Sequence, residues 1–143
     1  MSEQAFQEVA LRVALERAMA RKSDEYDQSA RRYADQLVGT KLDKTQIRGL
    51  ETLASTTDKV SDITDWLKLR VGRDSGRERW AKEGIGRDLV NELEGLRNDA
   101  KKIVQGLGQG DPDLERQVHL RLCREFLKHL AAHFEYLKAE RER

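Results

Sequence analysis

Large apolar residues recur three or four positions apart through most of this chain, the spacing that places them on one face of an α-helix. One run comprises Ile85, Leu89, Leu93, Leu96, Ala100 and Ile103, and another comprises Val118, Leu122, Phe126, Leu130, Phe134 and Leu137. Nowhere do apolar and polar residues alternate as a half-buried strand requires. The pattern therefore predicts an all-α fold without a sheet.

The composition favours the same fold class. About half of the 143 residues are Ala, Leu, Glu, Lys or Arg, which form helices readily, and the chain has a single proline. The hydrophobic share is 38% and the charged share 37%, so apolar residues can cover one side of each helix and little more. We expect a compact bundle of four to five helices joined by short loops.

Within one folding unit, the spacing predicts a partly separate N-terminal helical arm over residues 1–39 and a helical bundle domain over residues 40–143. In the arm, Phe6, Val9 and Val13 follow helical spacing, but the polar segment 21–24 is expected to interrupt the helix. The arm has few large apolar residues, so we expect it to need a partner surface to become ordered.

Local signals predict several helix boundaries. Asp43 and Gln46 form the pattern of a capping box, flanked by Leu42 and Ile47 as a hydrophobic staple, which predicts a helix starting at Lys44. A short helix is expected to open at residues 57–58, and the segment 72–76 is expected to be a loop. An aspartate followed by proline at 111–112 predicts the start of the last helix.

Few residues suggest chemistry. His129 and His133 could face one side of a helix, but no third ligand is apparent, so we predict no metal and no cofactor. Cys123 lies on an apolar face and is expected to be a small core residue. No residue set suggests catalysis, and we predict that the protein is not an enzyme. The lone cysteine and the lack of apolar runs typical of signal peptides or membrane spans favour a cytoplasmic protein without membrane contact.

Basic residues cluster in the segment 68–87. It contains seven basic and three acidic residues, a net charge of +4, whereas the whole chain has a net charge of +1. Helical spacing predicts that Trp80 is exposed among them, and an exposed aromatic beside cations suits base stacking and phosphate contact. Gly84 and Gly86 would let a nucleic-acid backbone approach the main chain. A second basic stripe, Arg121, Arg124 and Lys128, is expected on the solvent side of the last helix.

The same residues have a simpler interpretation. Both basic groups can be solvated helix faces with local salt bridges, and Trp80 can be packed at a helix start. On composition and spacing alone, nucleic-acid binding and this alternative are equally supported.

The order of three motifs resembles the small helical subunit of type III CRISPR effector complexes, the Csm-type small subunit family. The segment 42–48, Leu-Asp-Lys-Thr-Gln-Ile-Arg, is similar to the Leu-Thr-x-x-Gln-Ile-Arg opening of that family. The segment 79–87 resembles its Ala-Tyr-rich stretch ending in Gly-Arg, with Trp80-Ala81 in place of Ala-Tyr. The segment 126–136 is similar to its closing Phe-rich helix. The resemblance covers roughly residues 40–140, and the N-terminal arm is longer than the family pattern.

The resemblance implies a non-catalytic structural subunit that stacks in several copies beside the CRISPR backbone subunits. It would contact the backbone of the guide RNA–target RNA duplex, while base pairing reads the sequence. The motifs place RNA contacts at Arg48 and Arg87, which helical spacing also puts on solvent faces. Charge placement adds the remaining candidates: Arg73, Arg77, Arg79, Lys82, Arg121, Arg124 and Lys128. The alternative function is a helical adaptor or oligomeric scaffold that binds no nucleic acid.

Overall fold

Five α-helices make up the part of the chain that the computed structural model describes, residues 2–142. They are α1 (Glu3–Val38), α2 (Lys44–Thr56), α3 (Val60–Arg73), α4 (Ile85–Gly106) and α5 (Pro112–Arg141), with a short 3₁₀ turn, η1 (Lys82–Gly84), before α4. These residues contain no strand, and the predicted all-α bundle is confirmed. No helix among them is both long enough and apolar enough to cross a membrane.

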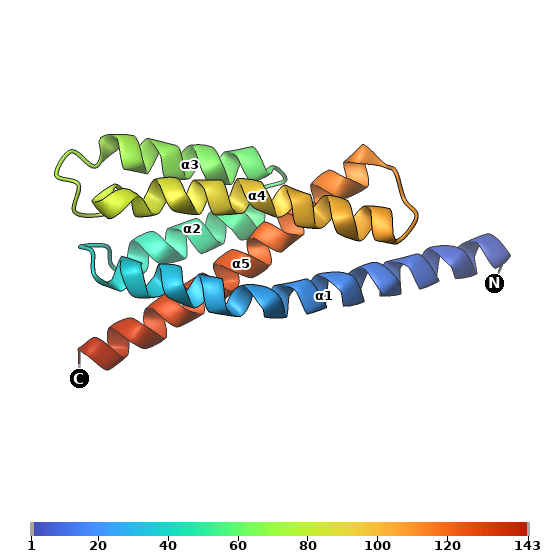
Figure 1. The fold of residues 1–143 in the computed structure, drawn as a ribbon, viewed down its shortest axis with the longest axis horizontal. Coiled ribbons are helices and arrows are strands. Elements are labelled where there is room, and N and C mark those ends of the chain that lie inside the picture. Colours follow the sequence, from blue (N-terminus) through green and yellow to red (C-terminus); the bar gives the residue numbers. More distant parts are fainter. Residues whose placement is uncertain (1, 143) are drawn as a thin grey trace.

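The helix α5 packs against every other helix of the bundle. It crosses the others diagonally in Figure 1, and its longest contact is with α1. Its predicted apolar face is confirmed: Val118, Leu122, Phe126, Leu130 and Phe134 are buried, and Leu137 is half-buried. The predicted face of α4 is also buried except at Ile103, which is partly buried, while the neighbouring Val104 is buried in the core instead. The low share of apolar residues is therefore enough to form a core, because α5 alone provides a packing surface for the other four helices.

The expected interruption of the first helix at residues 21–24 is wrong, because α1 runs without a break from Glu3 to Val38. Ser23 is buried there, and its hydroxyl lies 3.0 Å from Nε2 of His129 on α5. Lys22 forms ion pairs with Glu25 and with Asp99 of α4. Polar residues that appear to break the apolar pattern thus have polar partners on neighbouring helices.

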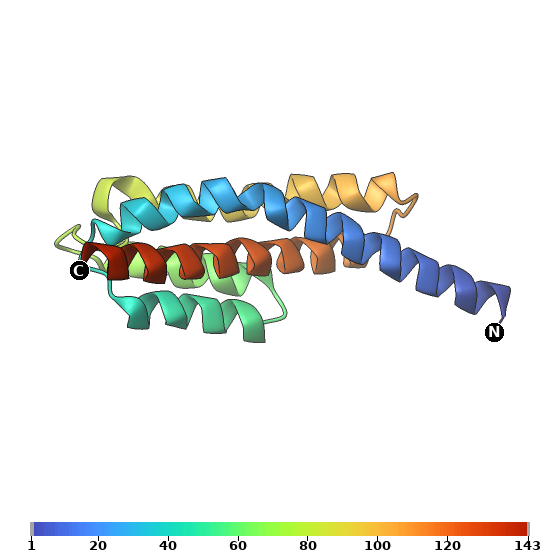
Figure 2. The same cartoon turned by 90° about the horizontal axis from the view of Figure 1, so that it is seen from below.

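The first half of α1 extends beyond the bundle, as Figures 1 and 2 show. Phe6, Val9 and Val13 are 66%, 46% and 42% exposed, and the first buried residue of the helix is Met19. The second half of α1 packs on α5 and α4. The residues of the expected arm therefore belong to one helix whose two halves differ in burial.

Two predicted helix starts are confirmed. The Asp43 carboxylate accepts from the backbone N–H groups of Thr45 and Gln46, and the Gln46 side chain accepts from the Asp43 N–H at 2.8 Å. At the start of α5, the Asp111 side chain caps the first turn that begins with Pro112. In contrast, α3 starts at Val60, later than expected, and it continues to Arg73, so the loop that follows it occupies residues 74–81.

Close packing at the start of α4 requires a glycine. Gly86 is buried, and a Cβ built there would lie 2.4 Å from Cγ2 of Val71 and 2.6 Å from the carbonyl oxygen of Trp80. That carbonyl also accepts a hydrogen bond from the Gly86 N–H at 2.8 Å. The missing side chain therefore lets α3, α4 and the loop between them meet.

We predict that Gly86→Ala lowers the free energy of unfolding by about 1–3 kcal/mol, because the new methyl group overlaps backbone that cannot move freely. The matched control is Gly95→Ala in the same helix, where an added Cβ meets no atom within 4 Å. The control is expected to raise stability by about 0.5–1 kcal/mol through helix propensity. Urea denaturation followed by circular dichroism measures both, and equal effects at the two positions would contradict the packing argument.

A buried histidine joins α5 to α4. Nε2 of His119 lies 2.9 Å from the carbonyl oxygen of Leu93, and the Cys123 thiol donates to the same oxygen at 3.5 Å. Burial lowers the pKa of His119, although the contact with the Leu93 carbonyl opposes this shift. Burial raises the pKa of the Cys123 thiol to about 12, so Cys123 is an unreactive core residue, as its position in the sequence predicts.

The lowered pKa of His119 predicts that stability falls in mild acid. Neutral His119 contributes fully to the free energy of unfolding at pH values above the pKa of an unfolded histidine. This contribution is lost as the pH falls below that pKa, because the unfolded chain binds a proton that the folded chain excludes. The free energy of unfolding should fall as the pH goes from about 7.5 to about 5.5, by at most about 1.4 kcal/mol per pH unit. His119→Gln should show a smaller slope in urea titrations at each pH, and an unchanged slope would exclude His119 as the source.

Candidate nucleic-acid interface

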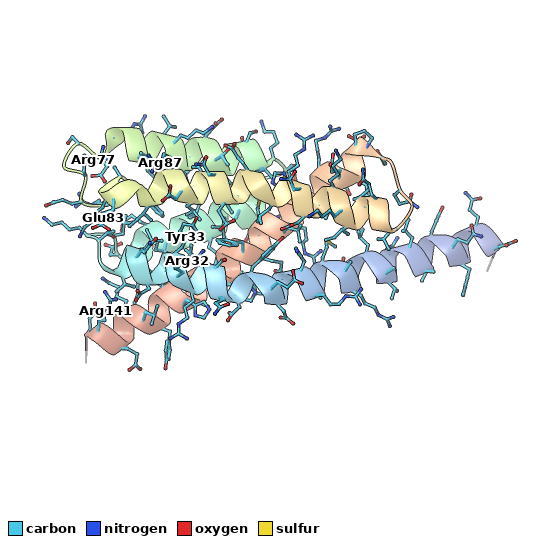
Figure 3. The ribbon with its side chains drawn as sticks, viewed as in Figure 1. Arg32, Tyr33, Arg77, Glu83, Arg87 and Arg141 are labelled. Carbon is cyan, nitrogen blue, oxygen red and sulfur yellow. The ribbon has the colours of Figure 1, made fainter. Side chains whose placement is uncertain are left out.

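Two loops meet at one end of the bundle and hold the cluster of basic residues together. The backbone N–H of Lys41, in the α1–α2 loop, donates to the Glu78 carbonyl of the α3–α4 loop at 2.9 Å. In the opposite direction, Nζ of Lys82 donates to the Gly39 carbonyl at 2.8 Å. We call this region the basic end, and it comprises Arg70, Arg73, Arg77, Arg79, Lys82 and Arg87. Figure 3 shows Arg77 and Arg87 at this end of the molecule.

One carboxylate organises the α3–α4 loop. Asp74 accepts hydrogen bonds from the backbone N–H groups of Glu78, Arg79 and Ala81, at 3.4, 2.9 and 2.9 Å. Burial alone would raise the pKa of Asp74, but these three donors lower it below its usual value. The charge of Arg79 also lowers the pKa of Asp74, but backbone groups occupy the carboxylate and no arginine side chain of the loop donates to it.

The prediction that Trp80 is exposed is wrong. Trp80 lies in the loop before η1, is 2% exposed, and packs edge-to-face against Trp66 of α3 with ring centroids 5.8 Å apart. The helical spacing used for the prediction does not apply, because α4 begins only at Ile85. Trp80 therefore anchors the loop to α3 and is not a base-stacking platform.

The expected access of a nucleic-acid backbone to the main chain is wrong for Gly86. Gly86 is buried between α3 and the Trp80 carbonyl, as described above. Gly84 has a φ of +74°, and a Cβ there would lie 2.8 Å from the Arg87 guanidinium. These glycines serve a tight loop-to-helix turn.

The basic residues of this end differ in what occupies their side chains. Arg77 donates to the Ala81 carbonyl, Lys82 donates to the Gly39 carbonyl, and Arg87 forms an exposed ion pair with Asp88 at 3.4 Å. In contrast, Arg73 and Arg79 are exposed, and neither side chain makes an ion pair or hydrogen bond within residues 2–142.

Sequence reasoning did not select Arg70. Its guanidinium lies 3.7 Å from the centroid of the Trp66 ring, and the two residues are one helical turn apart in α3. An aromatic residue followed four positions later by arginine is the signal that could have identified this pair.

The other motif candidate, Arg48, lies on α2 and is exposed, as predicted. Its Nε donates to Glu135 of α5 at 2.7 Å. The hydrogen bond from Arg48 lowers the pKa of Glu135. This contact ties α2 to α5 without burying either charge.

The expected basic stripe on α5 is not a uniform solvent face. Arg124 is half-buried, and its guanidinium donates to the carbonyl oxygens of Ala54 and Thr57, both at 2.7 Å. The placement of Arg124 on the solvent side is therefore wrong, since it caps the C-terminal end of α2. Arg121 forms an ion pair with Glu16 of α1, and Lys128 is exposed.

Arg124 also shows that the α5 residues lie apart from the basic end. It contacts the last turn of α2, whereas the Gly39 and Lys41 contacts lie before the first turn. The 13 residues of α2 extend about 20 Å, at a rise of about 1.5 Å per residue. The structure thus gathers Arg73, Arg77, Arg79, Lys82 and Arg87 but places Arg121, Arg124 and Lys128 elsewhere.

The two neighbouring histidines of α5 both contact α1. His129 lies against Ser23, and Nε2 of His133 lies 2.8 Å from an Asp27 oxygen. The contact with His133 lowers the pKa of Asp27. Across residues 2–142, no group of three or more His, Cys, Asp or Glu side chains is arranged to hold a metal ion.

Comparisons of this chain with known protein families, curated proteins and solved structures found no match.

The contacts of Arg124 predict a structural role. Arg124→Gln should lower the free energy of unfolding by about 1–3 kcal/mol, because it leaves carbonyl groups at the end of α2 without their donors. Lys128→Gln on the same helix is the control and should change stability by less than about 0.5 kcal/mol. Urea denaturation measures both, and a neutral Arg124→Gln would refute the capping role.

Proposed function

We propose that this protein is a non-catalytic structural subunit of a type III CRISPR ribonucleoprotein that contacts the backbone of the guide RNA–target RNA duplex. The observation that carries the proposal is the basic end, where exposed guanidinium groups surround a loop that is fixed by its own hydrogen bonds. Guanidinium groups suit phosphate, which they bind with parallel N–H donors. The motif resemblance supplies the type of complex.

In this role the protein needs charge and shape but no base readout. Arg48 and Arg87 each have one exposed carboxylate partner, Glu135 and Asp88 respectively. An exposed ion pair contributes little to stability, so either arginine can exchange its carboxylate for an RNA phosphate at small cost. Several copies would stack beside the CRISPR backbone subunits, each bringing its own basic end to the duplex, and a cytoplasmic location follows from this role.

The second candidate function is a helical adaptor or oligomeric scaffold that binds no nucleic acid. It is favoured by the exposed apolar residues on the projecting half of α1, Phe6, Val9 and Val13. An apolar stripe of this kind is typical of protein–protein contact.

The test that separates the two functions is purification of the tagged full-length chain from its native host. Mass spectrometry should identify CRISPR backbone subunits, and sequencing should identify short repeat-flanked guide RNAs. Unrelated proteins without a discrete RNA would refute the proposal and leave the adaptor as the function.

Within the purified complex, we predict that Arg48→Ala and Arg87→Ala each weaken retention of RNA. Each variant should lower the steepness of the log–log dependence of RNA affinity on salt by about 0.7–0.9, the value for one phosphate contact. The matched control is Arg116→Ala, which removes another exposed arginine paired with an aspartate on its own helix, Asp113. Circular dichroism should show equal helicity in all three, and unchanged RNA retention in both test variants would exclude these contacts.

A further inference from the structure

A small cavity opens within the basic end, between the start of α2, the last turns of α3 and the loop after it. Its volume is about 250 Å³, and its walls include Arg70, Arg73, Arg79 and Trp80. Pockets that enclose drug-sized ligands or cofactors usually measure about 300–1,000 Å³. This cavity is therefore better matched to one charged group and part of the residue that bears it.

The charge of the cavity walls is positive. Three arginines line it, together with Asp74, whose carboxylate oxygens accept from three backbone N–H groups. Over residues 2–142, the side chains of Arg70, Arg73 and Arg79 have no ion-pair partner within 4.0 Å. Asp74 offsets one of the three positive charges, and the repulsion between the charges that remain falls when an anion enters the cavity.

Arg70 and the backbone of the loop that carries Arg79 are held in place before any ligand arrives. Arg70 lies over the Trp66 ring, and Trp66 is packed against Trp80. Asp74 fixes the loop that carries Arg79. A side chain held as Arg70 is loses less conformational entropy on binding than a free surface arginine does.

Trp80 lines the cavity, and the nitrogen of its indole lies behind the wall. Nε1 of Trp80 is buried and has no hydrogen-bond partner within residues 2–142. Because it is buried, Nε1 is not a donor to a ligand in the cavity, but it lies in a ring that borders the ligand and can report on binding.

We propose that this cavity, which we call the phosphate pocket, binds one phosphodiester group of the RNA backbone through Arg70, Arg73 and Arg79. The inference rests on the proposed function for the identity of the polymer, since the cavity itself specifies only a phosphate oxyanion. Arg73 and Arg79 are the exposed donors, and Arg70 is the third donor, held against Trp66.

Two tryptophans, Trp66 and Trp80, make the pocket observable in solution. In ¹⁵N-labelled full-length protein each indole N–H gives one signal, which Trp66→Phe assigns. The protein is titrated with a short 5′-hydroxyl oligouridylate and, separately, with inorganic phosphate, at constant ionic strength maintained with chloride. We expect the oligouridylate to shift the Trp80 signal in a saturable manner.

The variants locate the binding group. Arg73→Ala should weaken oligouridylate binding about tenfold, the effect of losing one charge-assisted hydrogen bond. Arg12→Ala, which removes an exposed arginine from the projecting half of α1, should leave the affinity unchanged. Equal affinity of these two variants would overturn the assignment of the pocket.

The remaining outcomes separate this inference from the proposed function. If the Trp80 signal shifts with neither probe, the phosphate pocket is refuted, and the result of the purification test is unaffected. If the Trp80 signal shifts with inorganic phosphate but not with oligouridylate, the assignment of a phosphodiester as the ligand is refuted. The ligand is then a free phosphate or a terminal phosphate. A shift with oligouridylate that Arg73→Ala weakens supports the pocket, and purification without CRISPR subunits would then refute only the type of complex.

Discussion

The parallel packing of α1 against α5 is the interaction on which the rest of the structure depends. Polar contacts join Ser23 to His129, Asp27 to His133 and Asp35 to Arg141, with the same sequence separation in all three pairs. A constant separation means that the two helices run in the same direction in a fixed register. Between the polar pairs, the fully buried Ala30 and Ala34 allow close approach of the helices.

Because α1 and α5 are parallel, the chain between them must return from one end of the bundle to the other. Helices joined by a short loop pack antiparallel, so two parallel neighbours need a long connection. In this chain α2, α3 and α4 form that connection, and each packs on α5 as it passes. The turn from α3 to α4 comes to lie beside the turn from α1 to α2 at one end of the bundle. The basic end is thus a consequence of the topology, because the topology brings the cationic α3–α4 loop next to the α1–α2 loop, which holds the α3–α4 loop in place.

Features set by residues close in the chain could be predicted from the sequence. The capping box of Asp43 and Gln46 and the proline start of α5 involve neighbours within one helical turn, and both are confirmed. The apolar faces of α4 and α5 follow from the helical period alone. The exposure of Arg48 follows from the same rule.

Two of the wrong predictions involve partners outside the local helical turn. The polar segment 21–24 continues the helix because Ser23 contacts His129 of α5 and Lys22 contacts Asp99 of α4. These partners lie about 75–105 residues later, so no local rule identifies them. Trp80 was placed by helical spacing, but the short turn before α4 and the contact with Trp66 decide its burial. Tertiary packing overrode local periodicity in both cases.

The arginines show why charge placement alone does not define an interface. Arg124 and Arg73 look alike in the sequence, each a basic residue in a charged helical stretch. In the structure, the donors of Arg124 are occupied by the carbonyl groups of Ala54 and Thr57, whereas Arg73 makes no such contact and borders an open cavity. Removing a guanidinium from buried carbonyls costs the fold a full set of hydrogen bonds, so such an arginine is not available to a ligand. The candidates for RNA contact are therefore the arginines that lack internal partners, Arg73 and Arg79, and those whose only partner is an exposed carboxylate, Arg48 and Arg87.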